Sequence, residues 1–146
     1  MIRTGILRSL VILALMFIVS VAGCRQNNRI AEINIAEITA DTTVVNVLYF
    51  RVKQRCETCD AVTHVTQKTI ATAFAGNSKV RYIEIENSLK ANEALVEKYE
   101  VIWNALIIVK GDDVVDITQR AFLNAVNNPQ ILENLIKEEV HKRIRH

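Results

Sequence analysis

The sequence predicts an α/β domain built as a three-layer sandwich, with a central mixed sheet between helices in the order β-α-β-α-β-β-α. From residue 44 onward, short apolar runs rich in valine and isoleucine alternate with segments whose apolar residues recur at helical spacing. The 146-residue chain has only four glycines and one proline, which excludes a collagen-like or low-complexity protein. That length suits one domain, which we place at residues 44–146.

The pattern of residues 44–86 predicts a strand, a helix and a second strand. Residues 44–50 form a nearly continuous run of β-branched and aromatic residues, typical of a strand buried on both faces. Segment 56–75 predicts a helix, and Gly76 is typical of a helix C-terminus. Residues 79–86 alternate between apolar and polar and predict the second strand. The side chains expected in the core from these last two elements are Val62, Val65, Thr66, Thr69, Ile70, Ala73, Phe74, Val80, Tyr82, Ile83 and Ile85.

A short helix and a β-hairpin are expected next. Asn87 or Ser88 is a candidate cap for the helix, which continues through Tyr99. Residues 105–109 predict a buried strand and residues 114–117 its antiparallel partner, because a Lys-Gly-Asp-Asp turn separates them. The core residues expected from the helix are Ala91, Leu95 and Tyr99.

A last helix is expected to begin at Asn128 and Pro129, because a capping residue followed by proline is typical of a helix start. Favourable charge pairs four residues apart follow, each worth a few tenths of a kcal/mol. The pairs are Glu133 with Lys137, Glu138 with Lys142 and Glu139 with Arg143. The expected buried stripe is Ile131, Leu132, Leu135, Ile136 and Val140.

The N-terminus has the pattern of a signal peptide. Arg3 and Arg8 precede a 13-residue apolar run at 10–22, whereas a membrane-spanning helix needs about 20 residues. The run leads into Val-Ala-Gly-Cys24, which resembles the lipobox of bacterial lipoproteins. The resemblance implies that residues 1–23 are cleaved and that the Cys24 sulfur carries the lipid. The alternative is an ordinary signal peptide or N-terminal anchor in which Cys24 is incidental.

The mature chain is electrically balanced. Removing residues 1–23 removes Arg3 and Arg8 and no acid, so the 18 basic side chains fall to 16 and equal the 16 acidic ones. We expect no nucleic-acid partner, because such proteins usually carry a clear basic excess. Residues 24–43 are mostly polar, and their four isoleucines follow no sustained period, which predicts a lipidated cysteine and tether. The alternative is a short strand or helix that packs on the domain.

Lipidation would place the protein in the bacterial cell envelope, anchored to a membrane and facing an extracytoplasmic space. Arg25 follows Cys24, in place of the aspartate that retains many lipoproteins in the inner membrane. Attachment to the outer membrane is therefore expected where the cell has one.

The sequence Cys-Glu-Thr-Cys at 56–59 stands where the first predicted strand meets the first helix. With the strand at 80–87, Lys-Tyr-Glu-Val at 98–101 and the segment 106–116, this motif resembles the thioredoxin-like family over about residues 44–141. The resemblance implies a thiol-disulfide oxidoreductase that acts by dithiol/disulfide exchange without a cofactor. The implied partner is a protein that supplies a thiol or a disulfide.

The spacing suits this chemistry, because two cysteines three residues apart at a helix start can form a small ring. The partial positive charge of the helix N-terminus stabilises a thiolate and lowers the pKa of the first cysteine. We therefore expect Cys56, turned outward, to be the attacking nucleophile and Cys59, shielded, to be the resolving thiol. Nearby charges oppose one another, so the redox potential is not predicted. They are the basic Arg51, Lys53 and Arg55 and the acidic Glu57 and Asp60.

The chain departs from the family at two positions beside the motif. The family usually has a cis-proline before the third strand, and here that position is Asn104 or Ala105. The family commonly has tryptophan before the first cysteine, and here Arg55 stands there. Trp103 either covers the cysteines or packs in the core, and the core is slightly favoured. The substrate-groove candidates are Arg55, Glu57, Thr58, Trp103, Asn104 and Ala105.

Two other functions are compatible with the motif. One is a non-catalytic binding module whose cysteines form a structural disulfide, and the other is a lipoprotein that binds Cu(I) or another metal through the two thiolates. His64 follows Cys59 by five residues, which turns its side chain well away on a helix. We therefore expect His64 to be a surface or partly buried residue and predict no metal site.

Overall fold

The computed structural model describes Ile38 and residues 41–145, all within the compact unit Glu32–His146. The predicted signal peptide, Cys24 and most of the predicted tether lie outside the described residues. The elements in chain order are β1 (Val45–Arg51), α3 (Glu57–Ala73), β2 (Val80–Glu86), the 3-10 turn η1 (Lys90–Asn92), α4 (Glu93–Lys98), β3 (Ala105–Lys110), β4 (Asp113–Asp116), α5 (Thr118–Asn124) and α6 (Pro129–Arg145). The α/β class is confirmed.

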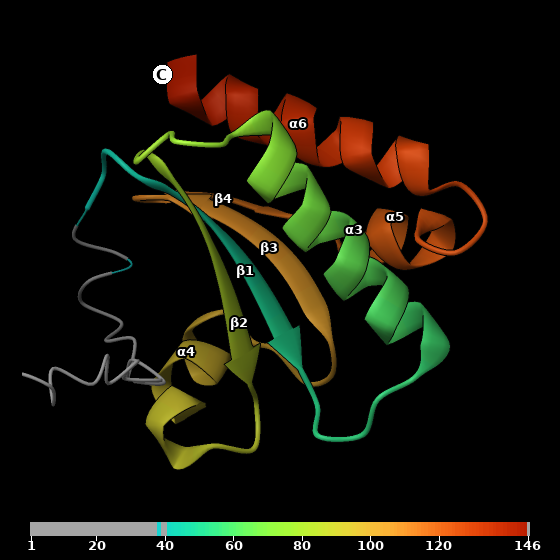
Figure 1. Ribbon diagram of the computed structural model, residues 1–146. Helices are drawn as coiled ribbons and strands as arrows, with labels where there is room; N and C mark the ends of the chain where they lie inside the picture. The colour runs from blue at the N-terminus through green and yellow to red at the C-terminus, as the bar shows by residue number, and fades with distance from the viewer. Residues whose placement is uncertain (1–37, 39–40, 146) are drawn as a thin grey trace, which may run out of the picture. The chain divides into compact units, whose positions relative to one another are not determined.

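The four strands form one mixed sheet in the order β2-β1-β3-β4. Strand β1 runs parallel to β2 and antiparallel to β3, and β3 forms the predicted hairpin with β4. Helices α3, α5 and α6 lie over one face of the sheet and α4 lies over the other (Figure 1). The apolar run of β1 is needed because both faces of that strand are covered.

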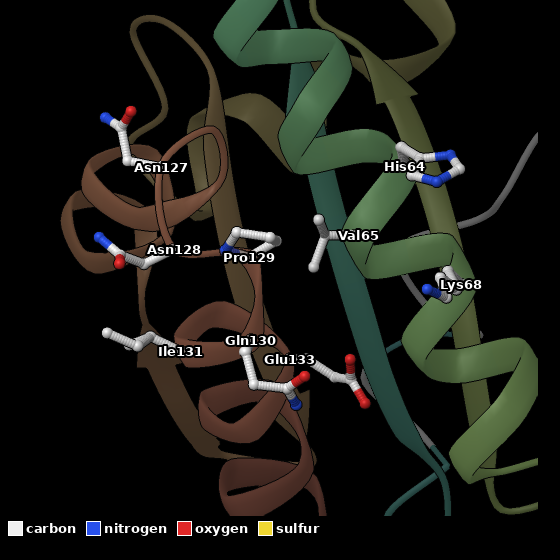
Figure 2. Close-up of a pocket in the computed structure, with 9 residues that line it drawn as sticks. All are labelled: His64, Val65, Lys68, Asn127, Asn128, Pro129, Gln130, Ile131 and Glu133. Carbon is white, nitrogen blue, oxygen red and sulfur yellow. The ribbon is translucent and has the colours of Figure 1, made fainter.

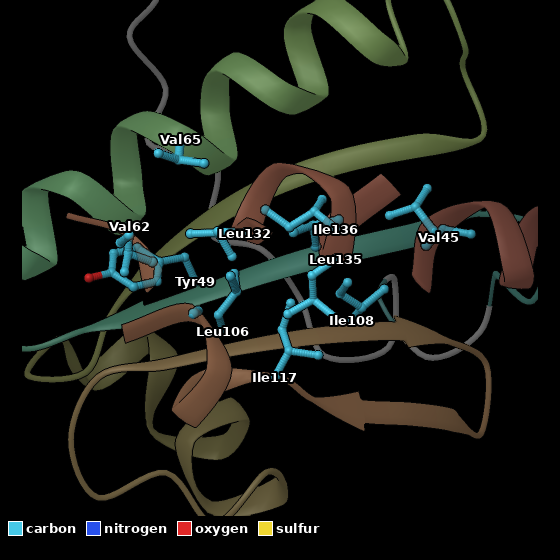
Figure 3. Packing of buried hydrophobic residues seen from close by; sticks show 14 of the residues in the cluster. Val45, Tyr49, Val62, Val65, Leu106, Ile108, Ile117, Leu132, Leu135 and Ile136 are labelled. Carbon is cyan, nitrogen blue, oxygen red and sulfur yellow. The ribbon is translucent and has the colours of Figure 1, made fainter. Parts of the chain in front are cut away.

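The larger core lies between the sheet and helices α3, α5 and α6. Figure 3 shows Tyr49 and Ile108 of the sheet together with Val62 of α3 and Leu132 and Ile136 of α6. Each of these side chains is at most 1% exposed. Burial of a large apolar side chain stabilises the fold by about 1.5–3 kcal/mol, so this layer holds α3 and α6 against the sheet.

A smaller core lies on the opposite face. Leu95 of α4 packs with Leu48 and Phe50 of β1, and Ile38 belongs to the same cluster. The side chain of Ile38 is 1% exposed, and its carbonyl accepts from Asn46 Nδ2 at 3.4 Å. The domain therefore extends beyond the predicted boundary at residue 44, and at Ile38 the alternative of a packed segment is the one observed.

The second helix starts later than predicted. Asn87 and Ser88 do not cap it, because Asn87 Nδ2 donates to the Trp103 carbonyl and Ser88 Oγ donates to Glu86. The turn η1 comes first, so Ala91 is exposed, whereas Leu95 is buried as expected. Asn87 instead joins the end of β2 to the loop before β3, and Ser88 bonds the Glu86 carboxylate, which competes with helix capping.

The last helix begins at Pro129 as predicted, and four of the five residues of its expected stripe are buried, namely Leu132, Leu135, Ile136 and Val140. The differences are Ile131 and Arg143. Ile131 is 53% exposed and Arg143 is 3% exposed. Arg143 forms ion pairs of 2.7 Å with Asp113 of the hairpin and with Glu139 of its own helix. A guanidinium is retained in this buried position because two carboxylates compensate its charge.

Helix α5 and the exposure of Ala73 were not predicted. Asp116 Oδ1 accepts from Thr118 N–H at 2.7 Å, and Thr118 Oγ1 accepts from Leu106 N–H at 2.9 Å. Helix α5 is only seven residues long, and the part of it that is fully buried is the small Ala121. The apolar pattern of so short a helix cannot be distinguished from that of a loop in the sequence.

We expect Gly111→Ala to lower the free energy of unfolding by more than Gly76→Ala does. Both glycines have positive φ, 56° and 72°, where a side chain costs about 1–2 kcal/mol. A Cβ at Gly111 would also lie 3.0 Å from Thr42 Cγ2, whereas a Cβ at Gly76 would have no described heavy atom within 4 Å apart from those of its chain neighbours. Urea denaturation of both variants measures the difference.

The double variant Thr42→Ser/Gly111→Ala is the control, because serine lacks the contacting methyl group. Its loss of stability should fall back to that of Gly76→Ala. Equal losses for the two single variants would show that Thr42 is not held over Gly111.

Candidate redox-active site

Cys56 and Cys59 form a disulfide at the N-terminus of α3, with Cα atoms 5.0 Å apart. Cys56 is the N-cap residue in an extended conformation, and its carbonyl accepts from Asp60 N–H at 3.0 Å. Its Sγ accepts from Cys59 N–H at 3.1 Å. A sulfur thus takes the place of the usual capping oxygen and receives one of the free N–H groups of the first helical turn.

The two sulfurs differ in their access to solvent. Cys56 is exposed, whereas Cys59 is 6% exposed. This matches the expectation that the first cysteine faces outward and the second is shielded. An incoming sulfur therefore reaches Cys56 and not Cys59.

Arg55 is held by carboxylates and does not stand as a free charge beside Cys56. Its guanidinium lies 2.9 Å from Asp60 Oδ1 and 3.3 Å from Glu84 Oε1. Arg51 pairs with Glu84 as well and lies 2.9 Å from Glu86 Oε2. Of the opposing charges predicted near the motif, the structure joins Arg51, Arg55 and Asp60 with two carboxylates of β2 in one partly exposed network. Ion pairs exposed to this degree contribute little to stability.

Two hydroxyl groups donate hydrogen bonds to the backbone carbonyl of Cys59 and fix its position. Thr63 Oγ1 donates to it at 2.9 Å and the buried Tyr49 Oη donates at 3.3 Å. Burial raises the pKa of Tyr49, so its hydroxyl stays protonated and remains a donor. The first turn of α3 is therefore attached to the centre of the sheet. Sequence reasoning missed both residues, although Thr63 stands one helical turn after Cys59.

Asn104 brings the loop before β3 to the cysteines. Its Oδ1 accepts from Val52 N–H at 2.9 Å, and its Nδ2 lies 3.5 Å from Cys59 Sγ. Ala105 is buried and pairs with Phe50 in the sheet. Of the two positions predicted to replace the cis-proline, Asn104 is the one that contacts a cysteine. The peptide bonds described in the structure are all trans.

Trp103 does not pack in the core, contrary to the slight preference from the sequence. Its side chain is 71% exposed, and its neighbour Ile102 is 82% exposed. Asn87 Nδ2 donates to the Trp103 carbonyl at 2.7 Å and so fixes this loop to the end of β2. Leu89, which follows β2, is 43% exposed. Large apolar side chains are thus left in solvent on loops that meet at the cysteine end of the sheet.

The remaining candidates lie apart or make no described contact. Glu57 is the first residue of α3 and is exposed, and Thr58 is partly exposed. His64 is exposed and lines a separate hollow between α3 and the start of α6, with Lys68 and Glu133 (Figure 2). In the part of the chain that the structure describes, no three His, Cys, Asp or Glu side chains are grouped to hold a metal ion.

No protein-family model matches the sequence, and no curated protein matches it. A solved structure described as "Structure of a malarial protein" is similar over 65% of this chain and 96% of its own, with 23% identity and a TM-score of 0.45. Similarity at this level carries no argument about function. Functional reasoning therefore rests on the residues of this chain.

Among Ile38 and residues 41–145, no helix has the length and apolar character needed to cross a bilayer.

We expect Glu100→Gly to raise the free energy of unfolding by about 1 kcal/mol. Glu100 has a φ of 53°, a left-handed conformation that normally favours glycine. It ends α4 in a pattern in which Glu100 N–H donates to Glu97 and Val101 N–H donates to Val96. Thermal or urea unfolding measures the gain, with the exposed Glu97→Gly as a control that should destabilise the helix. A loss of stability in Glu100→Gly would contradict strain at this turn.

Proposed function

We propose that the protein is a thioredoxin-like thiol-disulfide oxidoreductase. The observation that carries this proposal is the disulfide between an exposed Cys56 and a buried Cys59 at the N-terminus of α3. The exposed Cys56 sulfur is open to attack by a partner thiolate. The buried Cys59 sulfur is positioned to attack Cys56 in turn and release the partner. The partial positive charge at the N-terminus of α3 stabilises the cysteine thiolate that forms when the disulfide is opened.

The order of the elements supports the family resemblance. Strand β1 leads into the cysteines and α3, then β2 and α4 follow, and a hairpin and a C-terminal helix complete the domain. The loop before β3 lies beside the cysteines through Asn104, where the family places its substrate-binding proline. Helix α5 is an addition to the expected order.

The exchange proceeds through a mixed disulfide. In the reducing direction, the Cys56 thiolate attacks one sulfur of a partner disulfide, forms a bond to it and displaces the other partner sulfur as a thiolate. The Cys59 thiolate then attacks Cys56 Sγ, and the electron pair of the broken bond leaves with the partner's second thiolate. The protein dithiol loses two electrons and the partner disulfide gains them. The oxidising direction is the same sequence reversed.

The exposed apolar residues near the cysteines favour a polypeptide partner. Leu89, Ile102 and Trp103 present apolar surface on loops at the same end of the sheet. Exposed aromatic and aliphatic side chains of this kind are typical of surfaces that bind protein. The substrate of the exchange is therefore a protein disulfide or dithiol.

The proposal includes a lipid anchor at Cys24 and an extracytoplasmic location in the bacterial cell envelope. The support is the sequence pattern of residues 1–24. An envelope location also suits the chemistry, because disulfides form and persist in oxidising compartments.

The decisive test is to trap the mixed disulfide in cells. We expect Cys59→Ser, expressed in the native envelope, to accumulate disulfide-linked complexes through Cys56, because the resolving thiol is absent. Cys56→Ser should accumulate none through the motif, since Cys59, the cysteine of the pair that remains, is buried. Non-reducing electrophoresis followed by mass spectrometry detects and identifies the partners.

The double variant Cys56→Ser/Cys59→Ser is the control for complexes formed through Cys24. An absence of trapped partners in every variant would argue instead for a structural disulfide. In that case the double variant should be markedly destabilised, because a native disulfide in a small domain contributes about 2–5 kcal/mol.

The apolar surface makes a second prediction. We expect Trp103→Ala to slow reduction of an unfolded disulfide-bonded protein by about tenfold, as for loss of a well-placed aromatic contact. Reduction of a small disulfide such as oxidised glutathione should stay within about twofold of the unchanged chain, because it does not reach Trp103. Stopped-flow kinetics measures both rates. Leu123→Ala is the matched control, since Leu123 is 67% exposed on α5. If Trp103→Ala slowed the reduction of both substrates equally, a role of Trp103 in docking the protein substrate would be contradicted.

A further inference from the structure

A backbone contact holds the side chain of Asn104 in one orientation. Its Oδ1 accepts from Val52 N–H at 2.9 Å. An amide carries its acceptor and its donors on different arms, so a flipped side chain would set N–H against N–H and lose this bond. The Nδ2 arm therefore faces the other way, where it lies 3.5 Å from Cys59 Sγ.

The Cys59 sulfur is a group for which such a donor matters. Cys59 is 6% exposed, so water has little access to it. A thiolate in that position is disfavoured unless a hydrogen bond replaces the lost hydration. Tyr49 and Thr63 donate to the backbone carbonyl of Cys59 and not to its sulfur. The hydrogen bond described at the sulfur itself comes from Asn104.

The two sulfurs thus have donors of different kinds. Cys56 Sγ accepts from a backbone N–H of its own helical turn, at 3.1 Å. Cys59 Sγ accepts from a side chain 45 residues further along the chain. Substitution at residue 104 therefore changes the environment of the second sulfur and leaves the donor to the first in place.

We propose that Asn104 is a catalytic residue that stabilises the Cys59 thiolate through its Nδ2 and so speeds release of the partner from the mixed disulfide. This inference rests on the proposed function and assigns the group that activates the second cysteine. In the step concerned, the Cys59 thiol gives its proton to solvent. Its thiolate then forms a bond to Cys56 Sγ, and the bond from Cys56 to the partner breaks with the electron pair on the partner sulfur.

The step can be isolated with a small chromogenic disulfide, dithiobis-nitrobenzoate. The full chain in detergent, with Cys24→Ser to remove the third thiol, is reduced and mixed with the reagent at acid pH. Cys56 then attacks and releases one coloured thiolate, while Cys59 stays protonated. A jump to neutral pH starts the second release, which reports the attack of Cys59 on Cys56.

Asn104→Asp is the informative variant, because a carboxylate keeps the acceptor for Val52 N–H and replaces the donor facing the sulfur. We expect the first release to be unchanged and the second to slow by about threefold to tenfold at neutral pH. The pH profile of the second release should move to higher pH. Asn104→Leu, which also lacks the donor, should move it in the same direction.

Asn87→Asp is the matched control. Asn87 holds the same loop through the Trp103 carbonyl, and its described hydrogen bonds do not involve either sulfur. Both releases in this variant should stay within about twofold of the unchanged chain, since no sulfur contact is altered.

A second release in Asn104→Asp that is as fast as in the unchanged chain, or faster, overturns the assignment. Equal slowing in Asn87→Asp also overturns it, because loop position alone would then explain the effect. Failure of the proposed function looks different: no partner is trapped in cells, while the two releases from the chromogenic disulfide are still measured and still report on Asn104.

Discussion

The candidate site depends on strand β1 being enclosed on all sides. It pairs with β2 on one edge and β3 on the other, and its residues 45–50 are buried. The register sets Arg51 opposite Glu86 of β2 and Phe50 opposite Ala105 of β3. Three segments far apart in the chain therefore end or begin at one edge of the molecule. The cysteines follow β1 at that edge, so the contacts that join different segments at the site are fixed by this alignment.

Strand ends also explain the polar side chains that surround the disulfide. Where the sheet stops, backbone groups lose their ladder partners and must find others. Asn104 Oδ1 accepts a hydrogen bond from Val52 N–H, and Asn87 Nδ2 donates one to the carbonyl of Trp103. These bonds fix a loop whose large side chains, Ile102 and Trp103, are left in solvent. The same contacts that complete the sheet thus shape the surface at the end of the sheet where the cysteines lie.

The site is asymmetric in the way that exchange chemistry requires. Cys56 is exposed at the helix start and Cys59 is buried, with its carbonyl held by Tyr49 and Thr63. An accessible sulfur accepts a partner, and a shielded sulfur reacts only within the protein. The proposed exchange depends on this difference in exposure, and the proposed role of Asn104 depends on its amide lying 3.5 Å from the buried sulfur.

The sequence by itself determined the α/β class, the position of the cysteines at a helix start, and the start of α6 at Pro129. These features follow from local patterns: apolar period, turn residues and capping chemistry. It did not determine the late start of α4, the existence of α5 or the burial of Arg143, because each depends on partners elsewhere in the chain. The family resemblance left Asn104 and Ala105 as alternatives beside the motif, and the tertiary structure decided that Asn104 contacts Cys59 and that Trp103 lies in solvent. Asn104 and Cys59 are far apart in sequence, and they meet because β1 pairs with β3, a choice of neighbouring strand that depends on packing of the whole sheet and not on local spacing.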